Sequence, residues 1–246
     1  MNNQGLFTGK SDDYSRFRSS YPEAALDWLR ERCSGEQVLD IGAGTGIFTR
    51  LLLPRFKEVS ALEPNADMRR KFHELLPEVP CFDGTGESTG MKENSADLIT
   101  VAQAFHWLDE ERFKAEAKRI LRPHGKAAVI WNSSTKSDFS TARDSVCRKF
   151  CPRFKKGYAG KRPVHDGDDF LRHRYFREVE FAAFRNPFSM DLTVFEGNIR
   201  SRSYALASDH PDYAVFMSEL RSVFEAYAEN GVVTELQETQ IYLGEF

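Results

Sequence analysis

Two carboxylates and a glycine-rich turn could together form a nucleotide site in this chain. The stretch VLDIGAGTGIFT (38–49) places Asp40 at the end of an apolar run and a G-x-G-x-G turn (42–46) directly after it. Glu63 ends the next apolar run, EVSALE. Glycines allow a strand to turn sharply into a helix, and such turns commonly bind nucleotides. The pattern therefore predicts a nucleotide site, but a glycine turn alone does not say which nucleotide.

The two acids narrow the choice of nucleotide. Glu63 follows the turn by about twenty residues, where a carboxylate binds ribose hydroxyls in this architecture. Asp40 would repel a phosphate, and Ile47 stands where the dinucleotide fingerprint has its third glycine. The pair suits a positively charged nucleoside without phosphate, such as S-adenosylmethionine. The alternatives are that Asp40 caps a helix or braces the loop and that Glu63 is an exposed strand end.

Composition and charge exclude several other classes of protein. The 246 residues are 41% hydrophobic and 29% charged, as in soluble globular proteins, and the formal net charge is −3. That charge predicts no nucleic-acid partner, and the cationic stretch 147–162 is interpreted as a solvated helix face and loop. We find no membrane span, signal-peptide pattern or zinc-type cysteine spacing. We therefore expect a cytoplasmic protein with reduced thiols, no metal and no membrane partner.

The order of elements predicts the fold. Strands are expected at 37–42, 58–63, 79–84, 96–105 and 126–132, and helices at 22–33, 47–56, 66–76 and 109–123. Helical patterns follow within 133–178 and at 191–205 and 211–230, and strands at 178–190 and 234–246. This succession predicts an α/β fold: a Rossmann-like, doubly wound sheet of seven strands, mostly parallel, with an antiparallel C-terminal edge strand and helical cap insertions. We expect one structural domain, in which residues 1–132 form the cofactor-binding core with an N-terminal lid. Residues 133–246 would form the helical substrate region and the last two core strands.

The sequence resembles the class I S-adenosylmethionine-dependent methyltransferases, in particular the methyltransferase type 11 and trans-aconitate methyltransferase-like enzymes, which methylate small molecules. The resemblance rests on VLDIGAGTG, ALEPN (61–65), FDGTGESTG (82–90), AQAFHW (102–107) and ILRPHGKAAVI (120–130). His124 replaces the first glycine of the family's usual L-x-P-G-G segment. SDDYSRFRSSYP (11–22) is similar to the family's tyrosine-rich lid over the methionine end of the cofactor.

The resemblance implies S-adenosylmethionine as the cofactor and a set of residues that bind it. Asp40 and the glycine turn would hold the methionine portion and Glu63 the ribose, with the loop after the third strand at the adenine edge. Tyr14 and Arg18 of the lid would reach the cofactor carboxylate, the arginine through a charge-assisted pair. The full set of cofactor-binding residues is Tyr14, Arg18, Asp40, Gly42, Ala43, Gly44, Gly46, Glu63, Pro64, Thr85, Gly86, Glu87 and Gln103.

Methyl transfer is an in-line displacement, for which the protein mainly aligns the reactants and excludes water. A general base is needed only when the nucleophile has a proton to lose, so a carboxylate acceptor needs none. His106 is the catalytic candidate, as a base or as a residue that orients the acceptor. It would alternatively brace its loop while Trp107 packs under the cofactor.

The acceptor is expected to be a small molecule. AQAFHW stands where enzymes that methylate nucleic-acid or protein amides often carry an Asn/Asp-Pro-Pro-aromatic motif, and RNPF (185–188) is too late in the chain and is interpreted as a strand turn. Trp107, Arg200 and Arg202 are the candidate substrate residues, the arginines for an acidic group unless they lie on an exposed surface. We predict O-methylation of a carboxylate or hydroxyl. The alternatives are a non-catalytic S-adenosylmethionine-binding module and an NAD-dependent oxidoreductase.

Overall fold

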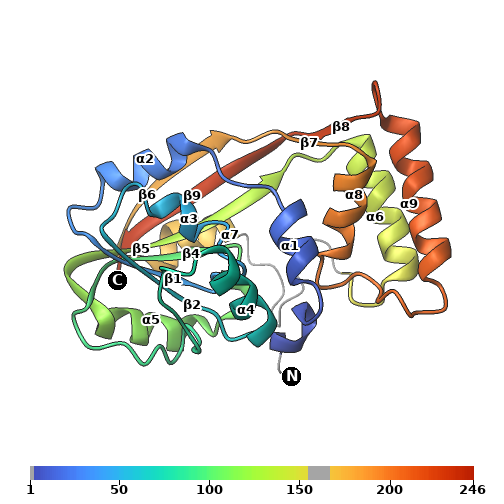
Figure 1. Cartoon of the computed structure of the whole chain (residues 1–246). Helices are drawn as coiled ribbons and strands as arrows, with labels where there is room; N and C mark the ends of the chain where they lie inside the picture. The colour runs from blue at the N-terminus through green and yellow to red at the C-terminus, as the bar shows by residue number, and fades with distance from the viewer. Residues whose placement is uncertain (1–2, 155–166) are drawn as a thin grey trace.

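A seven-stranded sheet runs through the protein, and the computed structural model describes residues 3–154 and 167–246. Residues 155–162 of the cationic stretch therefore lie outside the described part of the chain. In spatial order the strands are β3 (Cys81–Phe82), β2 (Glu58–Leu62), β1 (Gln37–Ile41), β4 (Ala96–Ala102), β5 (Leu121–Ser134), β9 (Gln237–Glu245) and β6 (Glu178–Arg185) (Figure 1).

The first five strands in this order are parallel, and β9 runs antiparallel to both β5 and β6. The predicted fold class is confirmed, including the antiparallel direction of the C-terminal strand. That strand lies one place in from the edge, however, because β6 pairs along its whole length with the outer side of β9. The edge is therefore formed by an earlier segment of the chain.

Helices cover both faces of the sheet. On one face, α2 (Glu23–Glu31) and α3 (Thr49–Leu52) pack on Val38, Leu98 and Ile241; on the other, α5 (Glu110–Ile120) packs on Leu39, Ile99 and Val101. Successive residues of β1 and β4 thus face opposite layers, as expected for central parallel strands. The helix α4 (Ala66–Leu75) packs at the β2–β3 side.

Several expected elements differ from the structure. The strand expected at 234–246 is divided into two that meet at Leu236, and the helix expected at 109–123 ends at Ile120 because β5 begins at Leu121. Residues 47–56 form only the short helix α3, because the glycine turn extends to Phe48 and Pro54 cannot continue a helix. Residues 79–84 form only the two-residue strand β3. The strand expected at 178–190 is broken after Arg185: β6 joins the main sheet, whereas β7 (Phe188–Met190) pairs with β8 (Val233–Glu235) in a separate two-stranded sheet. RNPF is the turn between them, as predicted.

The second half of the chain builds a helical cap beside the sheet (Figure 1). Its helices are α6 (Asp138–Phe150), α8 (Leu192–Arg200) and α9 (Tyr213–Tyr227), which share an apolar cluster that includes Phe195, Phe216 and Leu220. The short segments α7 (Gly167–Phe170) and η3 (Leu171–Tyr175) pack instead on the α5 face of the sheet. The expected helical insertions are therefore present, and α6, α8 and α9 pack together as the cap.

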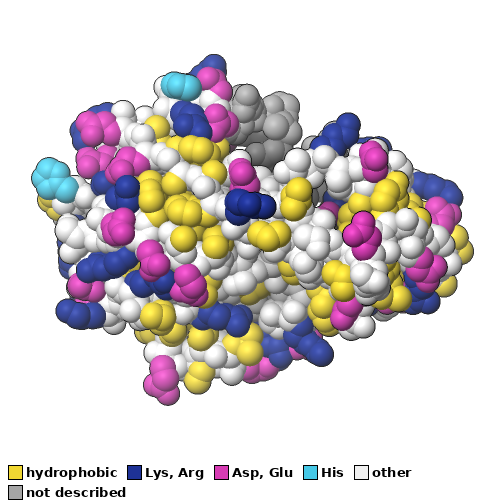
Figure 2. Space-filling model, turned by 90° about the horizontal axis from the view of Figure 1, so that it is seen from above, with side chains coloured by type: hydrophobic (Ala, Val, Ile, Leu, Met, Phe, Trp, Pro, Cys, Tyr) yellow, Lys and Arg dark blue, Asp and Glu magenta, His cyan; other side chains and the backbone are white. Residues whose placement is uncertain are grey.

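The N-terminal lid lies between the cap and the sheet. It comprises η1 (Asn3–Phe7) and α1 (Ser11–Phe17), and α1 contacts both α4 and α8 (Figure 1). On the surface seen in Figure 2, acidic and basic side chains are interspersed over the sheet domain and the cap. Among residues 3–154 and 167–246, no helix combines the length and apolar character that a membrane span requires. All four cysteines are buried and free.

Candidate active site

The glycine turn follows β1 and requires glycine for two reasons. Gly42, Gly44 and Gly46 all have positive φ, at 69°, 59° and 86°. A Cβ atom on Gly42 would lie 2.6 Å from the Cβ of Ala104, and one on Gly46 would lie 2.6 Å from Cδ1 of Leu76. The turn therefore combines a left-handed backbone with close packing, which L-residues with side chains tolerate poorly.

Glu63 lies at the carboxyl end of β2 and holds the glycine turn in place. Its Oε2 accepts a hydrogen bond from the backbone N–H of Gly44 and its Oε1 accepts one from Asn65, both at 2.8 Å. The side chain is buried, with 7% of its surface exposed, and this burial raises its pKa although the two hydrogen bonds oppose the shift. Each oxygen keeps capacity for a further donor, so Glu63 is able to accept ribose hydroxyls. Its burial is incompatible with an exposed strand end.

Asp40 is buried near the end of β1 between two threonines. Its Oδ2 accepts from the hydroxyl of Thr49 at 2.6 Å, and its Oδ1 accepts from Thr100 at 2.8 Å. Burial raises the pKa of Asp40 to about 6 against the opposing effect of these hydrogen bonds. The carboxylate thus braces the start of α3, and Asp40 also lines a small cavity at this edge of the sheet.

Two adjoining cavities open at the carboxyl ends of β1, β2 and β4. The larger has a volume of about 250 Å³. The residues predicted from the sequence that line it are Tyr14, Gly42, Gly44, Glu63, Pro64, Thr85, Gly86, Glu87, Gln103 and Trp107. The smaller has a volume of about 70 Å³. The predicted residues that line it are Tyr14, Arg18, Asp40, Gly42, Ala43, Gln103 and Arg202. Tyr14, Gly42 and Gln103 line both cavities, so the two form one continuous site. Gly46 lines neither and packs against α4 instead.

Gln103 fixes the boundary between the cavities. It follows β4 with a φ of 57°, which is uncommon for a residue other than glycine. Its backbone N–H donates to the carbonyl of Ile130 at 2.9 Å, and its Nε2 donates to that of Asn132 at 3.2 Å. Both bonds tie the turn to β5. A left-handed residue held in this way marks a strained segment at the centre of the site.

Tyr14 of α1 and Arg18, the first residue after α1, line the smaller cavity on the side of the lid. The Arg18 guanidinium lies 4.7 Å from the centroid of the Tyr14 ring, at a distance suited to a cation–π contact. Its Nε donates to the hydroxyl of Ser201 at 2.7 Å, and its Nη2 donates to the carbonyl of the same residue at 3.0 Å. Burial, and then repulsion from Arg202, lowers the pKa of Arg18 to about 10, so it remains a cation at neutral pH.

His106 lies in the short helix η2 (Phe105–Trp107), just beyond β4. Its ring stacks on Trp131 of β5 with centroids 5.4 Å apart, and it lies 4.7 Å from the ring of Trp107. Burial, and then the nearby charge of Arg18, lowers the pKa of His106 to about 4, so the imidazole is neutral at pH 7. Trp107 lines the larger cavity, whereas His106 packs behind it.

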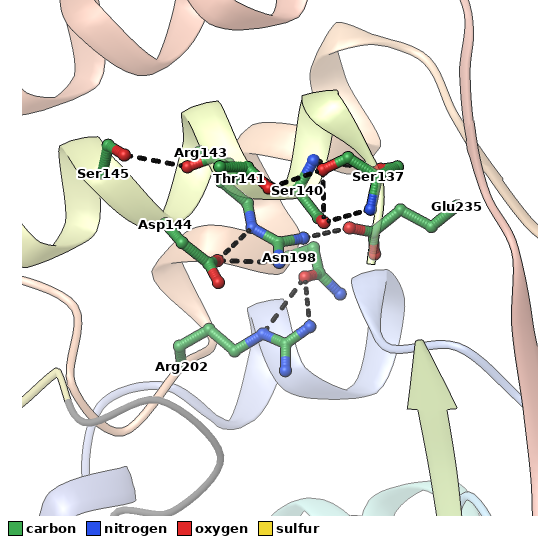
Figure 3. A network of polar contacts seen from close by, with 9 residues as sticks. All are labelled: Ser137, Ser140, Thr141, Arg143, Asp144, Ser145, Asn198, Arg202 and Glu235. Atoms are coloured by element: carbon green, nitrogen blue, oxygen red, sulfur yellow. Dashed lines mark hydrogen bonds and ion pairs between the residues drawn. The ribbon is translucent and has the colours of Figure 1, made fainter. Parts of the chain in front are cut away.

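The structure separates the two predicted substrate arginines. Arg200, the last residue of α8, forms an ion pair with Asp13 of the lid at 2.8 Å and lines neither cavity. Arg202 lines the smaller cavity, and its Nε and Nη2 both donate to Oδ1 of Asn198, at 3.2 and 2.9 Å. Figure 3 shows this pair beside the ion pairs of Arg143 in the cap.

Several residues of the site were not predicted. Asn65 could have been found from the sequence ALEPN, because it caps α4 and follows the predicted ribose acid. Asn132 and Ser134 lie at the end of β5, and Gln237 begins β9. Gln237 lines the smaller cavity because β9 pairs with β5, where Gln237 lies opposite Ser134, and no local pattern indicates that pairing.

Comparison with known proteins places this architecture in a family. The sequence model of a family described as Methyltransferase domain matches residues 39–129. An uncharacterised methyltransferase-like protein of Schizosaccharomyces pombe is 30% identical over 213 residues, which cover 84% of this chain and 81% of that protein. An uncharacterised methyltransferase of Mycobacterium tuberculosis is 41% identical over 120 residues, and that match spans only about half the length of either protein, at 49% of each.

The solved structures agree in fold. A candidate type II methyltransferase of Anaeromyxobacter dehalogenans has a TM-score of 0.69 at 23% identity, covering 93% of this chain and 98% of that one. The chain belongs to the class I S-adenosylmethionine-dependent methyltransferase family, as its strand order, glycine turn and relatives together establish.

Proposed function

We propose that the protein is an S-adenosylmethionine-dependent methyltransferase that methylates an oxygen atom of a small acceptor bearing a carboxylate or hydroxyl group. The observation that supports this most directly is the Glu63 carboxylate. It faces the larger cavity, is fixed by two backbone N–H groups and still has room for ribose hydroxyls. In this proposal residues 1–132 bind the cofactor, and the cap and lid enclose the acceptor.

The residues around the cavities fit the proposed cofactor. Glu63 would bind the ribose, and the loop with Thr85 and Gly86 would border the adenine. Asp40 faces the smaller cavity as an acid able to balance an ammonium group. Arg18 has no carboxylate partner among the described residues, which leaves its guanidinium available for the cofactor carboxylate. A phosphate-bearing nucleotide suits this pair of acids poorly.

The protein's own contribution is alignment and exclusion of water. When bound, the cofactor supplies a methyl group on a positively charged sulfur, so an acceptor carboxylate needs no loss of a proton to react. The lid and Trp107 close the site against solvent, which favours productive alignment. His106, with a pKa of about 4, is neutral and weakly basic at pH 7 and lines neither cavity, so it is poorly suited as a general base; this favours the carboxylate over the hydroxyl acceptor.

The test is a search for turnover. The full chain is incubated with S-adenosylmethionine and a panel of carboxylic acids and alcohols, and S-adenosylhomocysteine and methylated products are detected by mass spectrometry. We expect methyl ester formation that Glu63→Gln reduces. Binding of the cofactor without product from any acceptor would indicate a non-catalytic module, and tight binding of NAD in its place would contradict the proposal.

A further inference from the structure

Three cations lie together where the lid meets the cap. Lys10 donates from Nζ to two backbone carbonyls, one of them that of Arg202, at 2.5 and 3.4 Å. Arg18 donates to Ser201, and Arg202 donates to Asn198. All of these acceptors are neutral oxygens. Among the described residues, no carboxylate lies within ion-pair distance of any of the three.

The neighbouring arginines of the cap are different. Arg200 is paired with Asp13, and Arg143 is paired with Glu235 and Asp144 (Figure 3). Of the three cations without a carboxylate partner, Arg18 and Arg202 line the smaller cavity, whereas Lys10 does not. Burial, and then repulsion from Arg18, also lowers the pKa of Lys10 to about 8. A part-buried positive charge without an acidic partner is unfavourable, so the arrangement is suited to an anion that the protein does not itself provide.

An amide donor in the same cavity points to the same kind of ligand. Gln237 is buried, with 7% of its surface exposed, and lines the smaller cavity with Arg18 and Arg202. Its Nε2 has no hydrogen-bond partner within the part of the chain that the structure describes. Buried donors of this kind are rare in folded proteins, and a ligand oxygen would satisfy this one. The cavity volume, about 70 Å³, suits a compact group.

We propose that Arg202 and Gln237 form an anion subsite for the acceptor, separate from the position of the cofactor carboxylate. The inference rests on the proposed function, which assigns Arg18 to the cofactor. One carboxylate pairs with one guanidinium fork, so a second acid group is needed to balance Arg202. The acid group bound there is an anchor rather than the methyl acceptor, because pairing with a guanidinium withdraws electron density from both carboxylate oxygens and so weakens them as nucleophiles.

Lys10 supports the subsite from behind. Its Nζ binds the backbone carbonyl of Arg202, so it holds the segment after α8 against the lid and adds positive potential. The acceptor is thus expected to carry at least two functional groups, an anionic anchor and a separate oxygen nucleophile.

The experiment separates the two arginines by calorimetry on the full chain. S-adenosylhomocysteine is titrated first, and the loaded protein is then titrated with succinate and with benzoate as probes. Arg18→Gln should weaken S-adenosylhomocysteine binding by about tenfold or more. Arg202→Gln and Gln237→Leu should weaken binding of the carboxylate probes by about tenfold or more while changing S-adenosylhomocysteine affinity by less than about threefold.

Arg221→Gln, in an exposed ion pair of α9, is the matched control and should change neither affinity. The subsite is overturned if neither probe binds the loaded wild type, if Arg202→Gln leaves probe binding intact, or if it weakens S-adenosylhomocysteine as much as Arg18→Gln does. Should Arg202→Gln fail to fold by circular dichroism, Gln237→Leu decides the question. Failure of S-adenosylhomocysteine to bind the wild type would instead contradict the proposed function.

Discussion

Replacing Glu63 by glutamine tests the nucleoside part of the site. The carboxylate accepts one backbone N–H at each oxygen, from Gly44 and from Asn65, both at 2.8 Å. A glutamine has one acceptor oxygen, so its NH₂ group would face one of these N–H groups and leave it unpaired. An unpaired buried donor costs about 1–3 kcal/mol. The same NH₂ group replaces one of the two oxygens available to ribose hydroxyls.

We expect the dissociation constant of the cofactor to rise about 10- to 100-fold, equivalent to roughly 1.4–2.8 kcal/mol, because the bound ribose loses one acceptor oxygen; the unpaired N–H is present with and without ligand and lowers stability instead. The assay is calorimetric titration with S-adenosylhomocysteine and with methylthioadenosine, which has the same nucleoside but no amino-acid portion. Both ligands should weaken by the same factor. Glu58→Gln, at the exposed opposite end of β2, is the control and should bind both normally. If binding of S-adenosylhomocysteine weakens while binding of methylthioadenosine does not, Glu63 does not bind the ribose.

Three further predictions concern stability. Gly46→Ala should lower the free energy of unfolding by about 1–3 kcal/mol in urea titration, since φ at Gly46 is 86° and its packing is close. The control is Gly231→Ala, which should cost less because φ is also positive there but the space around it is open. Equal losses for the two variants would refute the packing argument. In the folded protein the pKa of His106 is lowered to about 4 from 6.5, so folding favours the neutral imidazole. The contribution of His106 to the free energy of unfolding is therefore complete above pH 6.5, and about 3 kcal/mol of it is lost as the pH falls towards 4. His106→Asn should remove that slope from the pH dependence of unfolding, and a persistent slope would assign it to another group. Arg200→Gln should cost no more than about 1 kcal/mol in thermal unfolding, because its pair with Asp13 is about one-third exposed, and a loss of several kcal/mol would contradict this.

The sheet was predictable where the signal is local. The strands β1 and β4 are apolar on both faces because helices cover both, and this pattern is visible within five and seven residues respectively. The length of α3 was not predictable from apolar spacing, because Gly46 and Pro54 limit the helix from both ends. The position of β9 within the sheet depends on long-range pairing, which periodicity does not reveal.

The same distinction holds for the candidate site. Asp40 and Glu63 end apolar strands, so their sequence positions predict that both reach the same edge of the sheet. Arg200 and Arg202 were equivalent in sequence, and they differ only because α8 ends at Arg200. The following turn directs Arg202 to the smaller cavity, whereas Arg200 meets the lid. Gln237 comes to the site through the sheet order alone.

The place of β9 between β5 and β6 has a consequence for biosynthesis. The strand β6 leaves the ribosome before α8 and α9, yet its only partner among the strands that the structure describes is β9, which is made after both helices. During translation β6 must therefore wait, with its backbone donors and acceptors unpaired in the sheet, while the cap helices are completed. The parallel core from β1 to β5 is free to assemble earlier. We accordingly expect the nascent chain to be most susceptible to strand mispairing while β6 is exposed and β9 is still within the ribosome.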